Sequence, residues 1–286
     1  MGTDEKIPPM FKTKVRRPRF EAVFQNKRRE QAFSRARGYA ELYRGSTPDG
    51  DFLNQRLARV LERLSSIGGG KLFDAGCGPG ILLSRLVGGP FELFGIDSNL
   101  EMIREVEAVT AGQAVHVAVA RLEQVPYPGE FFDVILAMGV LEYADVEAAL
   151  RELARVAKPN AIILVSMLNR DSLYWYWHLH VYRAWTAFKS RLSGGRSEPF
   201  ATPHKEEVLK GIMKKYEIEP LVVTYYNVNI CVEPLASRYW GLASRLNHTI
   251  ENRVGKKFSR LVHTGFIIEA VKRRSAEAAT HAVEQG

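Results

Sequence analysis

The amino-acid sequence predicts an α/β protein whose doubly wound, mostly parallel sheet has seven strands and carries helical cap insertions. Short apolar runs, typical of buried strands, alternate with helical patterns from Lys71 onward. Glycine-rich turns separate several of these runs from the helices that follow. With 286 residues, of which 46% are hydrophobic, the chain is long enough for one large α/β domain or two small ones.

The expected elements follow in chain order. The chain before residue 30 is polar and contains prolines, and we expect little regular structure there. Hydrophobic residues at spacings of three and four from Leu53 to Leu64 predict a helix that ends at the glycines 68–70. Strands that alternate with helices imply right-handed crossovers and parallel pairing, and we expect the last strand to be antiparallel. The seven predicted strands are 71–76, 91–97, 115–120, 131–138, 161–167, 220–226 and 264–273.

Local signals mark the helices between these strands. The first of them ends at Gly88–Pro90. Ser98 and Glu101 have the spacing of a capping box, which predicts the start of the next helix. Asp145 is expected to cap a later helix, and Pro159 is expected to stop it.

We divide the chain into five segments. Two stretches, 169–200 and 227–262, are additional to the strands and helices that the simplest alternating fold needs. Both follow strand ends, so we expect both to form lids over the carboxyl edge of the sheet. The segments are a basic arm (1–38), a core (39–168), an aromatic helical lid (169–200), the rest of the core with its inserted helices (201–273) and a tail (274–286).

The net charge of +8 is concentrated at the amino terminus. Residues 1–44 hold twelve Lys and Arg against five Asp and Glu, which gives +7, and the remainder holds 28 against 27. A basic arm of this kind contacts phosphates or anionic lipid surfaces, or is simply solvated. A homo-oligomer that shares the arm between protomers is a further alternative.

Composition excludes several classes of protein. The two cysteines, Cys77 and Cys231, support neither a disulfide scaffold nor a structural zinc site, and we expect no metal site. No apolar run approaches the roughly 18 residues of a membrane-spanning helix. The first residues lack the apolar segment of a secretory signal, so we expect a cytoplasmic protein.

The most informative motif is DAGCGPG at residues 74–80, between a predicted strand and a predicted helix. Its glycines allow a tight turn and a close approach of a ligand to a helix amino terminus. Asp97 ends the next strand, where a carboxylate can accept hydrogen bonds from both hydroxyls of a ribose. The dinucleotide pattern G-x-G-x-x-G requires glycine where this chain has Ile81. Asp74 also suits an amino group better than a pyrophosphate.

DAGCGPG, GIDSN at 95–99 and FFDVILAMGVLEY at 131–143 resemble the motifs of class I S-adenosylmethionine-dependent methyltransferases, which have a Rossmann-like fold. The resemblance is close over 39–168 and holds in outline over 200–273. It implies S-adenosyl-L-methionine as cofactor and methyl transfer by in-line displacement. The residues that it assigns to the cofactor are Tyr39, Tyr43, Asp74, Gly76, Cys77, Gly78, Gly80, Asp97, Ser98, Met102, Arg121, Leu122, Glu123, Ala137 and Met138.

Two positions depart from the pattern of the family. Arg121 stands where relatives have an acidic residue near the adenine, so backbone groups of Arg121 and Leu122, or the Glu123 side chain, are expected to replace it. Tyr143 stands where many relatives have a histidine, so that base is missing here.

Candidates for chemistry with the acceptor lie in the first lid and at the amino-terminal helix. A base would assist methylation of a hydroxyl or a protonated amine. His178 and His180 are the candidates for it, unless they are helix-surface histidines, and Tyr43 is a third catalytic candidate. We interpret Cys77 as a packing residue rather than a nucleophile. The candidates for binding the acceptor are Tyr143, Tyr174, Trp175 and Trp177.

The sequence favours a small-molecule acceptor. Residues 137–140 lack the Asn/Asp-Pro-Pro-aromatic tetrad of enzymes that methylate amines of nucleic acids, so we expect no nucleic-acid partner. The aromatic lid suits an apolar or aromatic acceptor such as a natural product or an indole-, quinone- or isoprenoid-like metabolite. Alternatives are an RNA or lipid methyltransferase that uses the basic arm, with contact to a membrane surface, and a non-catalytic cofactor-fold interaction protein. Whether oxygen, nitrogen or carbon receives the methyl group stays open.

Overall fold

The structure is a computed structural model, and it describes residues 36–44, 47–182, 203–229, 240–251 and 253–274. Most of the predicted arm and tail, Cys231 and the second half of the aromatic lid lie outside the described residues. The predictions made for those parts therefore stay predictions.

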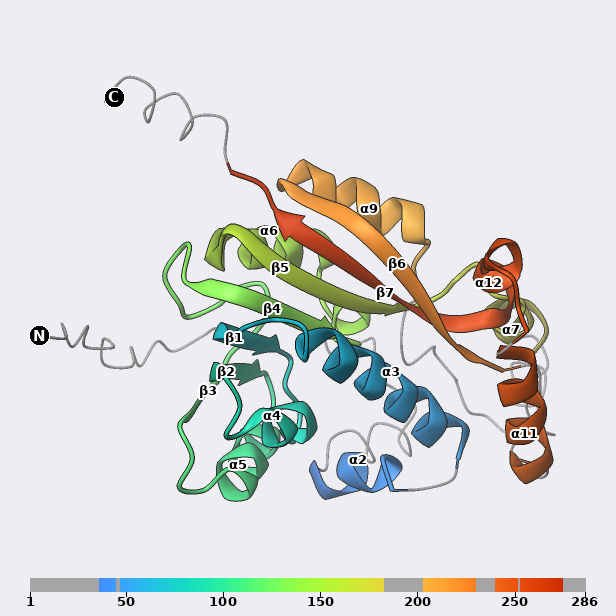
Figure 1. Cartoon of the computed structure of the whole chain (residues 1–286), viewed down its shortest axis with the longest axis horizontal. Helices are drawn as coiled ribbons and strands as arrows, with labels where there is room; N and C mark the ends of the chain where they lie inside the picture. Colours follow the sequence, from blue (N-terminus) through green and yellow to red (C-terminus); the bar gives the residue numbers. More distant parts are fainter. Residues whose placement is uncertain (1–35, 45–46, 183–202, 230–239, 252, 275–286) are drawn as a thin grey trace, which may run out of the picture.

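Seven strands form one mixed sheet in the order β3-β2-β1-β4-β5-β7-β6 (Figure 1). Strands β1 to β5 pair in parallel, and β7 runs antiparallel to both β5 and β6. This confirms the predicted doubly wound, Rossmann-like fold with an antiparallel last strand. The strands are β1 (Gly70–Ala75), β2 (Phe91–Asp97), β3 (Val115–Val119), β4 (Phe132–Met138), β5 (Ala157–Leu168), β6 (Ile218–Val228) and β7 (His263–Lys272).

Helices cover both faces of this sheet. Apolar residues of α3, α4 and α5 pack on one face, and those of α6 and α9 pack on the other. The helices are α2 (Ala36–Leu42), α3 (Pro48–Leu64), α4 (Ile81–Leu86), α5 (Leu100–Val109), α6 (Val146–Val156), α7 (Leu173–Trp177), α9 (Glu206–Lys215), α11 (Trp240–Glu251) and α12 (Lys256–Val262), with a 3-10 turn η1 (Leu141–Tyr143) and a π-turn η2 (His178–Tyr182).

Two local predictions need correction. Asn99, not Ser98, caps α5, and its side chain accepts a hydrogen bond from the backbone N–H of Glu101. Pro159 does not stop α6, which ends three residues earlier at Val156. Pro159 instead lies inside β5, where the register with β4 shifts and a residue without a backbone N–H is tolerated. Asp145 caps α6 as predicted, accepting from the N–H groups of the next turn.

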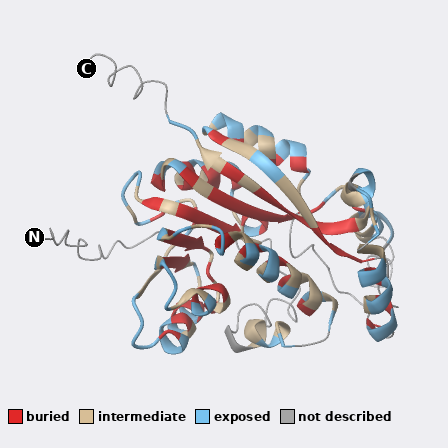
Figure 2. Ribbon diagram, viewed as in Figure 1, coloured by how far each residue is buried: buried red, intermediate tan, exposed pale blue. Residues whose placement is uncertain are grey.

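The buried residues concentrate in the strands, while the outer surfaces of the helices are exposed (Figure 2). An aromatic cluster anchors the centre of one face. Its members Phe73 and Phe132 stack with ring centroids 4.6 Å apart, and Phe94 and Tyr127 meet Phe132 edge-on. Because β1, β2 and β4 all contribute to it, the cluster holds together the strands that lead into the candidate site.

Helices α7, α11 and α12 stand together beyond the end of the sheet where β6 ends and β7 begins (Figure 1). They belong to the two predicted lid insertions. The Arg260 guanidinium of α12 pairs with the Asp171 carboxylate before α7 at 2.6 Å. The Asn169 side chain donates to the carbonyls of Arg260 and His263. Among the described helices, none has the length and apolar composition that crossing a bilayer requires.

The aromatic cluster yields a stability prediction. Phe132→Ala removes a fully buried ring and should lower the free energy of unfolding by about 3–5 kcal/mol. Phe258→Ala removes a ring that is 63% exposed and should change it by less than about 0.5 kcal/mol. Urea unfolding of the two variants and the parent chain tests this. Equal losses in both variants would contradict the assigned burial.

Candidate active site

The site lies where the order of the strands reverses. The chain leaves β1 and β4, which are neighbours in the sheet, toward opposite sides. Such a switch point leaves a crevice at the carboxyl ends of the strands. The glycine turn 76–80 after β1 and the segment 139–143 after β4 border that crevice.

The glycine turn forms a narrow backbone cradle. Gly76 has φ +83°, and a Cβ atom there would lie 2.4 Å from Cγ2 of Val140. The N–H groups of Gly76 and Cys77 both donate to the Ile96 carbonyl at 2.8 Å. The N–H of Gly78 donates to Oδ2 of Asp97 at 3.1 Å. The turn is thus bonded to the end of β2, and only glycine fits at its base.

Asp97 presents a partly exposed carboxylate beside this cradle. Its Oδ1 accepts from the N–H of Asn99 at 2.8 Å, which orients the group. Burial raises the pKa of Asp97, although backbone N–H groups of Asn99, Gly78 and Ser98 act in the opposite direction. Each carboxylate oxygen retains a lone pair for a ligand hydroxyl.

Two opposite charges are buried on the other side of the turn. Asp74 is 3% exposed, and burial raises its pKa to about 7, although the Arg56 guanidinium opposes this shift. Arg56 is 6% exposed on the inner face of α3, and its Nη2 donates to the Tyr39 hydroxyl at 3.5 Å. Burial lowers the pKa of Arg56, but the hydroxyls of Tyr43 and Tyr39 outweigh burial and raise it.

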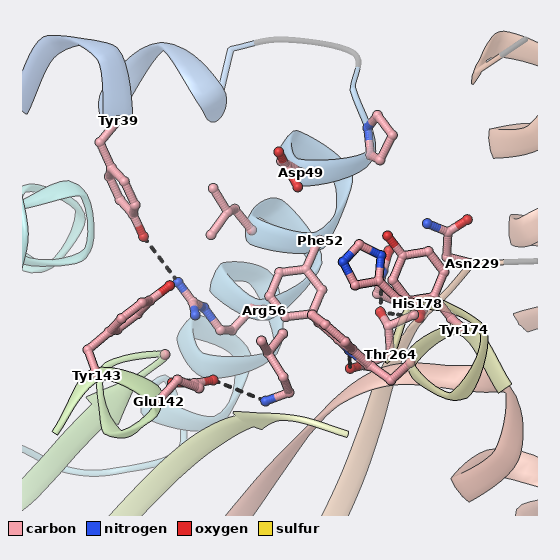
Figure 3. Close-up of a pocket in the computed structure, with 16 residues that line it drawn as sticks. Tyr39, Asp49, Phe52, Arg56, Glu142, Tyr143, Tyr174, His178, Asn229 and Thr264 are labelled. Atoms are coloured by element: carbon pink, nitrogen blue, oxygen red, sulfur yellow. Dashed lines mark hydrogen bonds between the residues drawn. The ribbon is translucent and has the colours of Figure 1, made fainter. Parts of the chain in front are cut away.

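A pocket of about 150 Å³ opens beside this charge cluster (Figure 3). One side carries Arg56, Glu142 and Tyr143, and the other carries Tyr174, His178 and the segment after β6. Aromatic and aliphatic side chains of α3, β5 and α7 form much of the wall between them. The lining residues are Tyr39, Pro48, Asp49, Phe52, Leu53, Arg56, Gly139, Glu142, Tyr143, Leu168, Tyr174, Trp175, His178, Asn227, Asn229 and Thr264.

The structure brings most of the predicted acceptor residues to this pocket. Tyr143, Tyr174, Trp175 and His178 line it. His178 packs against Trp175 with ring centroids 5.2 Å apart. The exposed residues Trp177 and His180 do not line it. The geometry therefore favours His178 over His180 as an acceptor contact.

Some of the predicted cofactor residues border the crevice, and the others are described by their burial. Tyr39 lies over the glycine turn, since a Cβ atom on Gly78 would be 3.9 Å from its ring, and Tyr43 meets Tyr39 edge-on at 5.8 Å. Asp74, Gly76, Gly80 and Asp97 border the crevice with them. The others vary in burial: Cys77, Met102, Leu122 and Ala137 are buried, Met138 is half-buried, and Ser98 is exposed.

On the side where the resemblance places the adenine, the Arg121 guanidinium is bound to the Glu123 carboxylate by two hydrogen bonds of 3.2 Å. The same carboxylate accepts from the N–H of Asp145. The side chain of Glu123 is thus engaged within the chain, which favours the backbone of Arg121 and Leu122 as the adenine contact.

Sequence reasoning missed several polar residues of the pocket. Arg56 is three residues after Leu53 and four before Val60, which places it on the apolar face of α3. A charged residue on the apolar face of a predicted helix is a sequence signal for a buried polar site. Glu142 and Asn229 gave no comparable signal, because their burial depends on how η1 and β6 pack.

Comparisons with known proteins agree with this geometry. A family model described as a methyltransferase domain matches residues 73–165. A ubiquinone biosynthesis O-methyltransferase of Bradyrhizobium diazoefficiens is 32% identical over 120 residues, which cover 41% of this chain and 47% of that protein. A protein of the same name from another Bradyrhizobium species is 26% identical over 201 residues, covering 68% of this chain and 74% of that protein. The chain spans about half the length of several such relatives.

Solved structures share the fold at low identity. A methyltransferase of Thermotoga maritima superposes with a TM-score of 0.56 at 18% identity, over 85% of this chain and 99% of that one. A Haloferax volcanii methyltransferase, solved with its activator, gives 0.56 at 16% identity, over 82% of this chain and 96% of that one. The fold is the one that these methyltransferases share, and residues 73–165 match a methyltransferase domain.

The residues present fit S-adenosylmethionine. The methionine part of that molecule carries one carboxylate and one ammonium, which complement the buried Arg56 guanidinium and Asp74 carboxyl. The glycine cradle admits a close backbone approach, and Asp97 offers acceptors for ribose hydroxyls. Tyr39 of α2 lies over Gly78 of the turn, and Tyr43, which follows α2, packs against Tyr39. Among the described residues, no cluster suited to a metal ion occurs.

Gly139 gives a prediction about the position of Arg56. It has φ +68°, and a Cβ atom there would lie 2.0 Å from Nη1 of Arg56. Gly139→Ala should therefore displace the guanidinium and weaken S-adenosylhomocysteine binding at least about tenfold. Gly112 has φ +76° with no atom within 4 Å of an added Cβ, so Gly112→Ala is the matched control. Both variants should lose about 1–2 kcal/mol of stability, but the control should keep its affinity in calorimetric titration.

Asp74 gives a prediction about pH. Between pH 3.8 and about 7, the folded protein holds a proton on Asp74 that the unfolded chain releases. This group therefore makes folding less favourable as pH rises through that window, and the effect levels off above it. Asp74→Asn lacks the effect, so its stability relative to the parent chain should increase from pH 4 to pH 7. Urea unfolding at several pH values measures the difference, and a constant or decreasing difference would contradict it.

Proposed function

We propose that this protein transfers a methyl group from S-adenosylmethionine to a hydroxyl of an aromatic, quinone-like small molecule. The observation that carries the proposal is the pocket, which combines aromatic walls with buried polar atoms directly beside the glycine cradle. The relatives named ubiquinone biosynthesis O-methyltransferase support both the choice of oxygen and the quinone-like acceptor.

The polar atoms of the pocket suit a hydroxylated ring. Oε2 of Glu142 and Oδ1 of Asn229 are buried and have no hydrogen-bond partner among the described residues. The two side chains come from different sides of the pocket (Figure 3). A ligand with hydrogen-bond donors at two places would bind both atoms. Burying these oxygens without a hydrogen bond costs free energy. Phe52, Tyr174 and Trp175 offer apolar faces for its ring.

Catalysis by this chain would consist chiefly of alignment and exclusion of water. When bound, S-adenosylmethionine supplies a methyl group that its sulfonium already activates. Arg56 and Asp74 would hold the methionine end, and Asp97 the ribose. Trp175 fixes one wall of the pocket, because its Nε1–H donates to the Thr264 carbonyl at 3.3 Å. Alignment of reacting atoms in such a closed site contributes several kcal/mol to a rate.

The alternatives are less well supported. An RNA or lipid substrate, membrane contact and a shared arm between protomers all depend on the basic arm, which is outside the described residues up to residue 35. A non-catalytic role would not require a glycine cradle and an acceptor pocket side by side. The cytoplasmic assignment stays a prediction.

Calorimetric titration and a methylation assay test the proposal together. The parent chain should bind S-adenosylhomocysteine with micromolar affinity and convert catechol to a singly methylated ether in the presence of S-adenosylmethionine, as mass spectrometry would detect. Asp97→Asn should weaken binding about tenfold to a hundredfold, because it weakens charge-assisted hydrogen bonds.

The matched control is Asp133→Asn. The Asp133 carboxylate binds the N–H of Lys71 and the ammonium of Lys158 near the start of β4, at the opposite edge of the sheet. This variant should keep the affinity of the parent chain. Folded parent protein that fails to bind S-adenosylhomocysteine would overturn the proposal.

A further inference from the structure

We propose that Glu142 is the catalytic base of this enzyme and that its Oε2 accepts the proton of the acceptor hydroxyl. The inference rests on the proposed function. It gives Glu142 the role of base in a chain that has Tyr143 where many relatives have a histidine. It competes with His178, which the sequence offers with His180 as a candidate base.

The position of Glu142 is defined by the backbone around it. It is the middle residue of η1, whose first residue, Leu141, is fully buried in the core. Its Oε1 accepts from the N–H of Leu168, the last residue of β5, at 3.0 Å. One carboxylate oxygen is therefore bonded to the sheet, and the side chain has little freedom to move away from the pocket wall.

The second oxygen is the reactive one. Glu142 is only 8% exposed, it lines the pocket, and its Oε2 has no hydrogen-bond partner in the described part of the chain. A buried carboxylate oxygen without a partner is costly unless a ligand or water supplies a donor. A hydroxyl on the acceptor is such a donor.

The charges that face Glu142 suit a base that works near neutral pH. Burial raises its pKa to about 7, although Arg56 of α3 and the backbone N–H groups of Glu142 and Leu168 lower it. From β6, the buried hydroxyl of Tyr226 interacts with the same carboxylate. A base with a pKa near the working pH combines an ionised fraction with an adequate affinity for the proton.

The proton transfer is balanced within the site. The O–H bond of the acceptor breaks, an O–H bond forms on Oε2 of Glu142, and the electron pair stays on the acceptor oxygen as the nucleophilic lone pair. The negative charge moves from the carboxylate to that oxygen, so the net charge beside Arg56 does not change.

His178 is less well placed for this step. Its ring packs between Tyr174 and Trp175, with centroid distances of 6.1 and 5.2 Å. In Figure 3 it lies with Tyr174 across the pocket from Glu142 and Arg56. Its contacts suit the wall that holds the acceptor ring, next to Asn229.

The test compares an acceptor that needs a base with one that does not. At pH 8, catechol keeps its hydroxyl protons, whereas 4-nitrocatechol is already ionised. Glu142→Gln should lower kcat for catechol about 100-fold or more and for 4-nitrocatechol less than about fivefold. Its affinity for S-adenosylhomocysteine should stay within about threefold of the parent value. Glu147→Gln, an exposed glutamate of α6 paired with Lys215, is the control and should change none of these values.

Each outcome decides between the hypotheses. Equal losses with both acceptors would assign Glu142 a structural role and overturn the inference, as would a kcat for catechol that Glu142→Gln leaves unchanged. His178→Gln with the pattern expected of Glu142→Gln would assign the base to His178. If the parent chain binds S-adenosylhomocysteine but methylates neither catechol, the hydroxyl acceptor is wrong, and the role of Glu142 is wrong with it. Failure of the parent chain to bind S-adenosylhomocysteine would instead contradict the proposed function itself.

Discussion

The buried guanidinium of Arg56 is the interaction on which the rest of the site depends. Moving a charge into a protein interior costs several kcal/mol unless neighbouring groups compensate. The compensation here comes from hydroxyls in and just after α2 and on β6, from the carboxyl of Asp74 near the end of β1, and from that of Glu142 in η1, which follows β4. Four separate parts of the chain must therefore converge on α3. The charge in this way couples the helix that covers the sheet to both loops of the switch point.

The same charge connects the glycine turn to the pocket. Arg56 faces Asp74 beside the glycine cradle, and it also lines the pocket with Glu142. A ligand that changes the charge around Asp74 changes the field at Glu142 as well, because both carboxyls interact with one guanidinium. Asp74 and Glu142 are thus electrostatically linked through Arg56. Gly139 completes the arrangement, since any side chain there would occupy the place of the guanidinium.

The sequence predicts the parts of this molecule that depend on local patterns. The strands, the glycine turn and Asp97 at the end of β2 are read from apolar runs and glycine spacing, and the structure has them where they were expected. The predicted N-cap of α5 is wrong by one residue, because Ser98 and Asn99 are both good N-cap residues. Glu142 and Asn229 escaped prediction for another reason. Their burial arises only when η1 and the end of β6 pack against helices distant in sequence.

The turn geometry of η1 explains why a base at 142, rather than at 143, is consistent with this fold. A 3-10 turn has three residues per turn, so successive side chains point about 120° apart. Leu141 enters the core and Glu142 enters the pocket wall, and Tyr143 is consequently directed to the rim, where it is 40% exposed. A side chain at the rim stays in contact with water. The position at 142 is desolvated, and burial raises the pKa of its carboxyl to about 7. The turn therefore places its carboxyl, and not the side chain at 143, inside the pocket wall.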